Sequence, residues 1–468
     1  MYRQIKEEFR MERTLTQGNA FKNIVLFSIP FLLANLLQTL YGMADLFIVG
    51  QFNGAASLSG VSIGSQVMHM LTVMIIGLGM GTTVMIGRAV GLGSLKEQQK
   101  VIGNSIVLFV LAGLAATGLL LWQIDSIVAI MLTPVEAIEE TRWYLMICFA
   151  ALPFIMAYNV ISSIFRGLGD SKSPLVFVAV ACVLNIMLDF LFIGVFGMRS
   201  AGAACGTVLS QACSVLFALI VIGRRKLIHI ERKDLFLDRK TIRSIVKIGM
   251  PICLQDGLIQ ISFIIITIIA NARGVEIAAT VGVVEKVIGF FFLVPSSMLS
   301  SISAICAQCV GIGQHRRAFE TLKYGCLIGL SFGLFFTILC QFLSGPIVSL
   351  FTHDPEVIRF GTQYLRAYVA DCVFASISFG FGGYFTAYGY SMISFLHNVV
   401  SIVLVRVPGA YFTSKLFPDT LFPMGLTSPL GSLLSATICV SVYFVMRRKG
   451  VFGTAENKRS DSFAFEHQ

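Results

Sequence analysis

Twelve apolar runs, each long enough to cross a lipid bilayer, follow one another along almost the whole sequence. A membrane-spanning helix needs about 20 mostly apolar residues, and only helices and closed barrels satisfy all backbone hydrogen bonds within lipid. The runs lie near residues 24–50, 56–87, 102–122, 143–165, 175–197, 201–223, 244–271, 277–310, 323–344, 362–386, 393–414 and 425–446. Because runs of this length are typical of helices, the sequence predicts an all-α membrane protein with twelve transmembrane helices.

Composition and charge agree with a membrane protein and argue against nucleic acid as a partner. Charged residues make up 13% and hydrophobic residues 56% of the 468 residues, whereas about a quarter of the residues in a soluble domain are charged. The net charge of +10 comes from lysine and arginine residues that lie mostly in the gaps between apolar runs. We therefore expect the lipid bilayer and small molecules as partners, and no nucleic acid.

The lysine and arginine residues also predict how the chain is oriented in the membrane. Most of them lie before residue 24, after residue 446 and in the segments 88–100, 166–174, 224–247 and 316–323. These segments alternate onto one side of the membrane, and cytoplasmic loops carry the excess of basic residues. The sequence therefore predicts a multi-pass protein of the cell membrane with both termini in the cytoplasm.

The two halves of the sequence resemble each other at an offset of 220 residues. Ala89–Gly93 returns as Cys309–Gly313, and Gly169 returns as Gly389. Two six-helix halves have the same orientation, and transporters built from such repeats place the substrate site between them. This repeat predicts a transporter of two six-helix bundles that moves by rocking one bundle against the other.

The longest basic stretch lies at the middle of the chain and separates the two halves. The predicted organisation is a cytoplasmic tail, an N-terminal lobe, a cytoplasmic linker, a C-terminal lobe and a second cytoplasmic tail. Their ranges are 1–23, 24–223, 224–243, 244–446 and 447–468.

Two carboxylates, Asp45 and Asp189, lie inside apolar runs. A charged side chain at membrane depth costs roughly 2.5–3.5 kcal/mol on insertion scales, so such residues usually face a cavity and have a function. Asn185 lies four residues before Asp189 on the same helical face, where its amide can hydrogen-bond the carboxyl group in either protonation state. An apolar cleft favours the neutral acid, which suits these groups to proton exchange. The alternative is a structural pair satisfied by helix caps or water.

Four segments carry a resemblance to a known transporter family. They are Gln38–Asp45, Phe165–Pro174, Asn185–Asp189 and Gly202–Gln211. Together with the twelve runs and the repeat, they resemble the multidrug and toxic compound extrusion (MATE) family over roughly residues 20–446, and in detail its DinF-like branch. The resemblance implies two six-helix lobes and secondary active multidrug efflux, in which small amphipathic, cationic compounds are exchanged for H⁺ or Na⁺ by alternating access.

The resemblance also implies which residues couple transport to an ion. The positions that match the proton-coupled branch are Asp45, Asn185, Asp189 and Thr207. Other members use acidic residues in helices 7 and 10, where this chain offers Gln255, Asp256 and Asp371. Exchange against inward protons is the expected function. Na⁺ coupling, or export of a lipid-linked or metabolite substrate, is the alternative within transport.

Aromatic and polar side chains in the apolar runs are candidates for lining the substrate cleft, because aromatic faces attract cations. The candidates are Tyr41, Tyr144, Tyr158, Asn159, Gln255, Asp256 and Asp371. Plain packing is the alternative for the aromatic ones. Pro30 and Pro251 are predicted to kink their helices, because proline removes a backbone hydrogen bond. Glu285, Lys286 and Arg406 lie in later runs, where they either join a charge network or extend to the membrane interface.

The sequence contains no common enzyme motif such as HExxH, GxSxG or a Walker lysine loop, so no catalytic residues are expected. Cys306 and Cys309 have CxxC spacing, but no second pair or histidine set completes a zinc site. We therefore expect a monomeric transporter without metal or cofactor, apart from its coupling ion. The alternatives from other classes are an intramembrane enzyme, which would form product without a gradient, and a channel, which would conduct without saturation.

Overall fold

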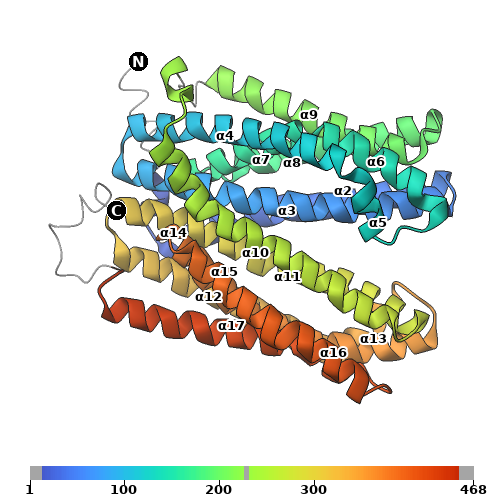
Figure 1. Cartoon of the computed structure of the whole chain (residues 1–468). Helices are drawn as coiled ribbons and strands as arrows, with labels where there is room; N and C mark the ends of the chain where they lie inside the picture. Colours follow the sequence, from blue (N-terminus) through green and yellow to red (C-terminus); the bar gives the residue numbers. More distant parts are fainter. Residues whose placement is uncertain (1–12, 226–230, 453–468) are drawn as a thin grey trace. The chain divides into compact units, whose positions relative to one another are not determined.

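The structure is a computed structural model that describes residues 13–225 and 231–452, and every regular element in these residues is helical. Figure 1 shows the elements in chain order. They are η1 (Arg13–Thr16), α2 (Ala20–Phe52), α3 (Ala55–Leu92), α4 (Leu95–Trp122), α5 (Ile124–Ile130), η2 (Val135–Ala137), α6 (Ile138–Ala150), α7 (Leu152–Leu168), α8 (Lys172–Asp189), η3 (Phe190–Val195), α9 (Arg199–Arg225), η4 (Arg232–Leu235), α10 (Arg239–Asn271), α11 (Val275–Gly311), α12 (His315–Ser349), α13 (Pro355–Tyr368), α14 (Asp371–Ala387), α15 (Ser391–Ser401), η5 (Ile402–Arg406), α16 (Val407–Leu416) and α17 (Phe422–Arg448). Of the short η elements, η3 and η5 are π-helical.

Eleven of the described helices are long and apolar enough to cross a membrane, and a bent pair adds a twelfth span if it counts as one. The pair consists of Val135–Ala150 and Leu152–Leu168, which are bent by 53° at their junction. It falls on the fourth predicted run, 143–165. Each of the twelve predicted runs therefore has a helical counterpart of suitable length and composition. The predicted tails and linker lie partly outside the described residues.

The chain packs as two compact units. The first includes Val25–Gln260, and the second includes Thr14–Ile24 and the described residues from Ile261 onward. The division therefore falls inside α10, and each unit is described by itself below. The lobe ranges that follow from the sequence repeat stay a prediction about the organisation of the chain.

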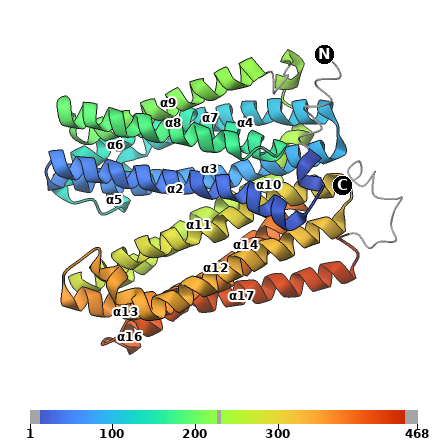
Figure 2. The ribbon, with the colours of Figure 1, turned by 180° about the vertical axis from the view of Figure 1, so that it is seen from behind.

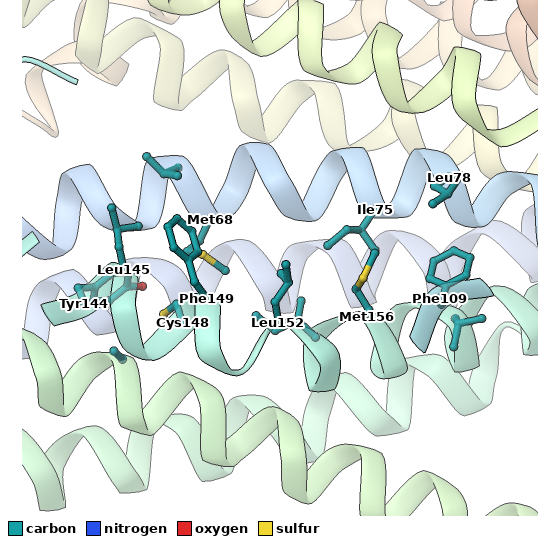
Figure 3. Close-up of a cluster of buried hydrophobic side chains, with 14 of the residues drawn as sticks. Met68, Ile75, Leu78, Phe109, Tyr144, Leu145, Cys148, Phe149, Leu152 and Met156 are labelled. Atoms are coloured by element: carbon teal, nitrogen blue, oxygen red, sulfur yellow. The ribbon is translucent and has the colours of Figure 1, made fainter. Parts of the chain in front are cut away.

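The core of the first unit lies where α3, α4, α6 and α7 meet (Figure 3). Leu145 and Phe149 of α6 are fully buried there. Because lipid tails are as apolar as leucine, helices in a membrane are held mainly by close packing, which small residues at the interface permit. Gly60 of α3 lies against the α6 backbone at Thr141, and Gly64 lies against the ring of Tyr144. The glycines of α3 thus allow α6 to approach closely.

The first half of α10 also packs against α3 through glycines. Gly81 of α3 lies against the carbonyl oxygen of Ile245, and Gly249 of α10 lies against the backbone of Leu78. A methyl group at either glycine would collide with main-chain atoms, which cannot move aside as a flexible side chain can. This close crossing explains why α10 up to Gln260 belongs to the first unit.

The second unit is built around α11, α12, α13, α14 and α17, which Figure 2 shows from behind. Its turns confirm the repeat seen in the sequence. Gly93 and Gly313 end α3 and α11 with left-handed φ values of 68° and 71°. Gly169 and Gly389 follow α7 and α14 with φ values of 96° and 80°. Left-handed φ favours glycine, so both pairs, each 220 residues apart, mark equivalent helix ends in the two halves.

The start of α10 is fixed by Asp238, just outside the predicted span. Its carboxylate accepts hydrogen bonds from the backbone N–H of Thr241 at 2.9 Å and from the Thr241 hydroxyl at 2.6 Å. Lys100 of α4 forms an ion pair with it at 3.0 Å, and the Asn104 side chain accepts from the Asp238 backbone N–H at 2.7 Å. The Thr241 hydrogen bonds and, to a lesser degree, Lys100 lower the pKa of Asp238 to about 2.

We expect Asp238→Ala to lower stability by about 0.5–2 kcal/mol, the usual effect of losing a helix N-cap. Because the pKa is lowered in the folded protein, the stabilisation is fully present above the ordinary aspartate pKa of about 4. It should disappear as the pH falls toward about 2. Thermal unfolding of both proteins across this pH range measures the effect, with Asp234→Ala as the loop control. A difference that stays constant down to pH 2 would contradict this assignment.

Candidate functional site

Four side chains that the sequence singled out lie together inside the first unit: Asp45 on α2, Asn185 and Asp189 on α8, and Thr207 on α9. The Thr207 hydroxyl donates to Asp45 Oδ2 at 3.2 Å, and the Asn185 amide is 3.5 Å from Thr207 Oγ1. Asp45 also lies within interaction range of Asp189. All of this occurs in the interior, because Asp45 is 5% and Asp189 0% exposed.

The geometry of α8 and α9 explains how Asp189 reaches this cluster. Asn185 and Asp189 lie one helical turn apart, and α8 passes at Asp189 into the π-helical segment Phe190–Val195. Such segments occur often at functional sites. On α9, Gly206 lies directly against Asp189 Oδ1, so no side chain fits at that position.

Sequence reasoning missed both the π-helical segment and the role of Gly206. The π-helical segment has no simple sequence signal. The close approach at Gly206 had one, in the small residues Gly202–Gly206 that begin α9. Small residues at this spacing allow neighbouring membrane helices to approach each other closely.

Several oxygen atoms of the cluster have no hydrogen-bond partner. They are Oδ1 of Asp45, Oδ1 of Asn185 and both carboxyl oxygens of Asp189. Within residues 13–225 and 231–452, no lysine, arginine or histidine forms an ion pair with either aspartate. Two carboxyl groups in this setting can share a proton, or their oxygens can surround a small cation.

The predicted cleft residues of the first unit lie mostly in its packed interior. Tyr144 is 3% exposed and its ring packs against Gly64, and Figure 3 shows it among core side chains. Tyr158 is buried, and Tyr41 is half-buried with its hydroxyl hydrogen-bonded to Gln211. The amide of Asn159 donates to the Ile155 carbonyl of its own helix at 2.8 Å. Their contact with a substrate stays a prediction.

The other predicted cleft residues are divided between the two units. Gln255 and Asp256 lie on the part of α10 that belongs to the first unit, where Gln255 is buried and Asp256 lies beside Gly77 of α3. Asp371 lies on α14 of the second unit and is fully buried. The structure therefore does not bring these three residues together within one unit.

The charged residues of the later runs find separate partners. Arg406 forms an ion pair with Asp371 at 2.9 Å. Glu285 lies 3.5 Å from the hydroxyl of Thr267, and Lys286 is exposed. The charge network considered from the sequence is therefore present between Asp371 and Arg406, whereas Lys286 points to the surface.

The two prolines lie inside long helices, as expected. Pro30 is in α2, fifteen residues before Asp45, and Pro251 is in the first half of α10. Neither can donate a backbone hydrogen bond, so each helix lacks one bond of its ladder there. Whether these positions bend during transport stays a prediction.

Comparisons with known proteins agree with this geometry. One family model, MatE, matches the chain twice, over residues 30–191 and 251–412. The probable multidrug resistance protein YpnP of Bacillus subtilis is 30% identical over 434 residues, which are 92% of this chain and 96% of that protein. The multidrug export protein MepA of Staphylococcus haemolyticus is 24% identical over 90% of this chain and 92% of its own length. A solved MATE protein in complex with MaL6 has a TM-score of 0.87 at 22% identity, covering 93% of this chain and 98% of its own.

The structural match confirms the predicted MATE fold, and the double match of one model confirms the internal repeat. The matched family consists of transporters rather than enzymes. The chain is therefore a multi-pass membrane protein that belongs to the MATE family of multidrug transporters.

Proposed function

We propose that this protein exports small amphipathic, cationic compounds in exchange for inward protons, as a member of the DinF-like branch. The observation that carries the proposal is the pair of buried carboxyl groups, Asp45 and Asp189, without a basic partner. A buried charge at membrane depth is costly, and a proton removes that cost reversibly.

A proton gradient drives transport only if protonation changes the balance between the two orientations of the protein. The contact between Asp45, Asn185 and Thr207 joins α2, α8 and α9, so loss or gain of a proton at Asp45 changes how these three helices are held together. Pro30 weakens the backbone ladder of α2 on the other side of Asp45. Protonation at Asp45 would thus be transmitted to the shape of α2.

The relatives support the class of substrate. YpnP and MepA carry the names of multidrug resistance and multidrug export proteins. Cations bind to aromatic faces, and methionine side chains adapt to ligands of different shape. The 39 phenylalanine, 12 tyrosine and 18 methionine residues supply many such surfaces. We further propose that the transporter acts as a monomer with both termini in the cytoplasm.

Na⁺ is the second candidate for the coupling ion. The unpartnered oxygens of Asp45, Asn185 and Asp189 are hard ligands of the kind that alkali and alkaline-earth cations bind. Export of a lipid-linked or metabolite substrate uses the same cluster and differs only in what the cleft accepts.

Proteoliposomes with an imposed gradient separate the two ions. We expect efflux of a fluorescent organic cation when the substrate side is made alkaline relative to the other side, at equal Na⁺ on both. A Na⁺ gradient at equal pH should give little transport. Transport driven by Na⁺ alone would replace H⁺ by Na⁺, and saturation-free flux without a gradient would contradict antiport altogether.

A further inference from the structure

The second unit contains a buried ion pair in its interior. Arg406 Nη2 lies 2.9 Å from Asp371 Oδ2 and 3.0 Å from the hydroxyl of Ser432. The Asp371 side chain is inaccessible and that of Arg406 is 9% exposed. The three residues come from α14, η5 and α17. A pair this deeply buried is costly to desolvate and so requires an explanation.

The repeat relates this pair to the coupling cluster of the first unit. The two family matches begin at residues 30 and 251 and end at 191 and 412, a spacing of 221 residues at both ends. At this spacing, Arg406 stands where Asn185 stands in the first half. The span that carries each of them also contains a π-helical segment, Phe190–Val195 in one half and Ile402–Arg406 in the other.

The last span of each half completes the correspondence. Gly206 lies against the carboxyl group of Asp189, and Gly431 lies against the side chain of Arg406. The next residue in each case, Thr207 or Ser432, supplies a hydroxyl to the cluster. Both units therefore hold a charged side chain against a glycine and a hydroxyl on their last span.

We propose that Arg406 is a tethered cation that occupies the second unit's counterpart of the ion site, so that only the first unit exchanges an ion with solution. This inference rests on the proposed role of Asp45 and Asp189. A guanidinium group stays protonated at any physiological pH and cannot leave the protein. Asp371 is therefore neutralised in every step of transport, whereas the carboxyl groups of the first cluster depend on an ion from outside.

Other ionisable groups face this ion pair and have to be separated from it. Tyr364 and Tyr368 of α13 and Glu285 of α11 all lie within electrostatic range of one another and of the pair. Glu285 has its own hydroxyl partner in Thr267. A test therefore needs to vary Asp371 as well as Arg406.

Arg406→Asn tests the proposal, because asparagine is the residue at the matching position of the first half. The experiment uses the full chain with Asp45→Asn and Asp189→Asn, which silence the first cluster. In detergent at pH 8, we measure the unfolding temperature in NaCl and in choline chloride at equal ionic strength. Adding Arg406→Asn should create an Na⁺-specific rise of at least about 2 °C, since Asp371 then binds the ion. The rise should shrink at pH 5, where a proton replaces Na⁺.

Two further variants complete the test. Asp371→Asn added to Arg406→Asn should remove the Na⁺ effect and raise the unfolding temperature, because both buried charges are then gone. Arg406→Lys keeps a tethered cation and should show no Na⁺ effect.

The outcomes are distinct. A folded Arg406→Asn protein without an Na⁺ effect overturns the proposal. So does an Na⁺ effect in the parent protein that still contains Arg406. If Arg406→Asn does not fold, a double variant no more stable than the single one also overturns it. None of these results depends on transport, so a failure of the proposed coupling role of Asp45 is recorded separately.

Discussion

Asp45→Asn should lower proton-driven efflux by roughly tenfold or more, to the level of protein-free liposomes, without unfolding the protein. Asparagine has the shape of aspartate and can still accept the hydrogen bond that Thr207 donates to Asp45 Oδ2. It cannot take up or release a proton. The loss therefore reports on titration at this position rather than on packing. A factor of ten in rate corresponds to about 1.4 kcal/mol.

The measurement combines transport with stability. Efflux of a fluorescent cation from proteoliposomes under an imposed pH gradient is compared with the unfolding temperature of the same preparation. We expect that temperature to stay unchanged or rise, because a buried carboxylate without a basic partner has been removed. Asp125→Asn is the matched control, since Asp125 is 73% exposed and pairs only with Arg142 at the surface. Full efflux by a folded Asp45→Asn protein would exclude Asp45 from coupling.

Much of the fold follows from the sequence because a membrane imposes simple rules. Backbone groups in lipid must be satisfied internally, so a run of about 20 apolar residues is a helix wherever it occurs. The repeat was visible because its turns need left-handed backbone, which keeps glycine at positions such as Gly93 and Gly313. The division within α10 was not visible. It depends on a close helix crossing at Gly81 and Gly249, and isolated glycines in an apolar run do not show what they contact.

The candidate site follows from the sequence only in part. Asp45 and Asp189 stand out because charge is rare at membrane depth. Their meeting with Asn185 and Thr207 was expected from the family resemblance, not from spacing. The pairing of Asp371 with Arg406 links residues 35 positions apart on different helices, and that distance could not be read from either apolar run. Tyr144 illustrates the opposite case, because an aromatic residue in an apolar helix looks the same whether it lines a cleft or fills the core.

Gly206→Ala should abolish coupled transport almost as completely as loss of Asp189 itself. The added methyl group would occupy the place of Asp189 Oδ1, so either the carboxyl group leaves the cluster or α8 and α9 move apart. Overpacking of this kind usually costs about 1–3 kcal/mol of stability. Gly223→Ala is the matched control on the same helix, because nothing lies within 4 Å of the methyl group there.

Combining Gly206→Ala with Asp189→Ala separates the two effects of the substitution. Removing the carboxyl group removes the collision, so the double variant should regain most of the stability lost by Gly206→Ala alone. Transport should remain absent, because Asp189 is then missing from the site. Neighbouring residues that share one contact give such non-additive energies, whereas independent ones do not. Wild-type efflux by Gly206→Ala, or additive losses of stability in the double variant, would show that α9 does not hold Asp189 in its working position.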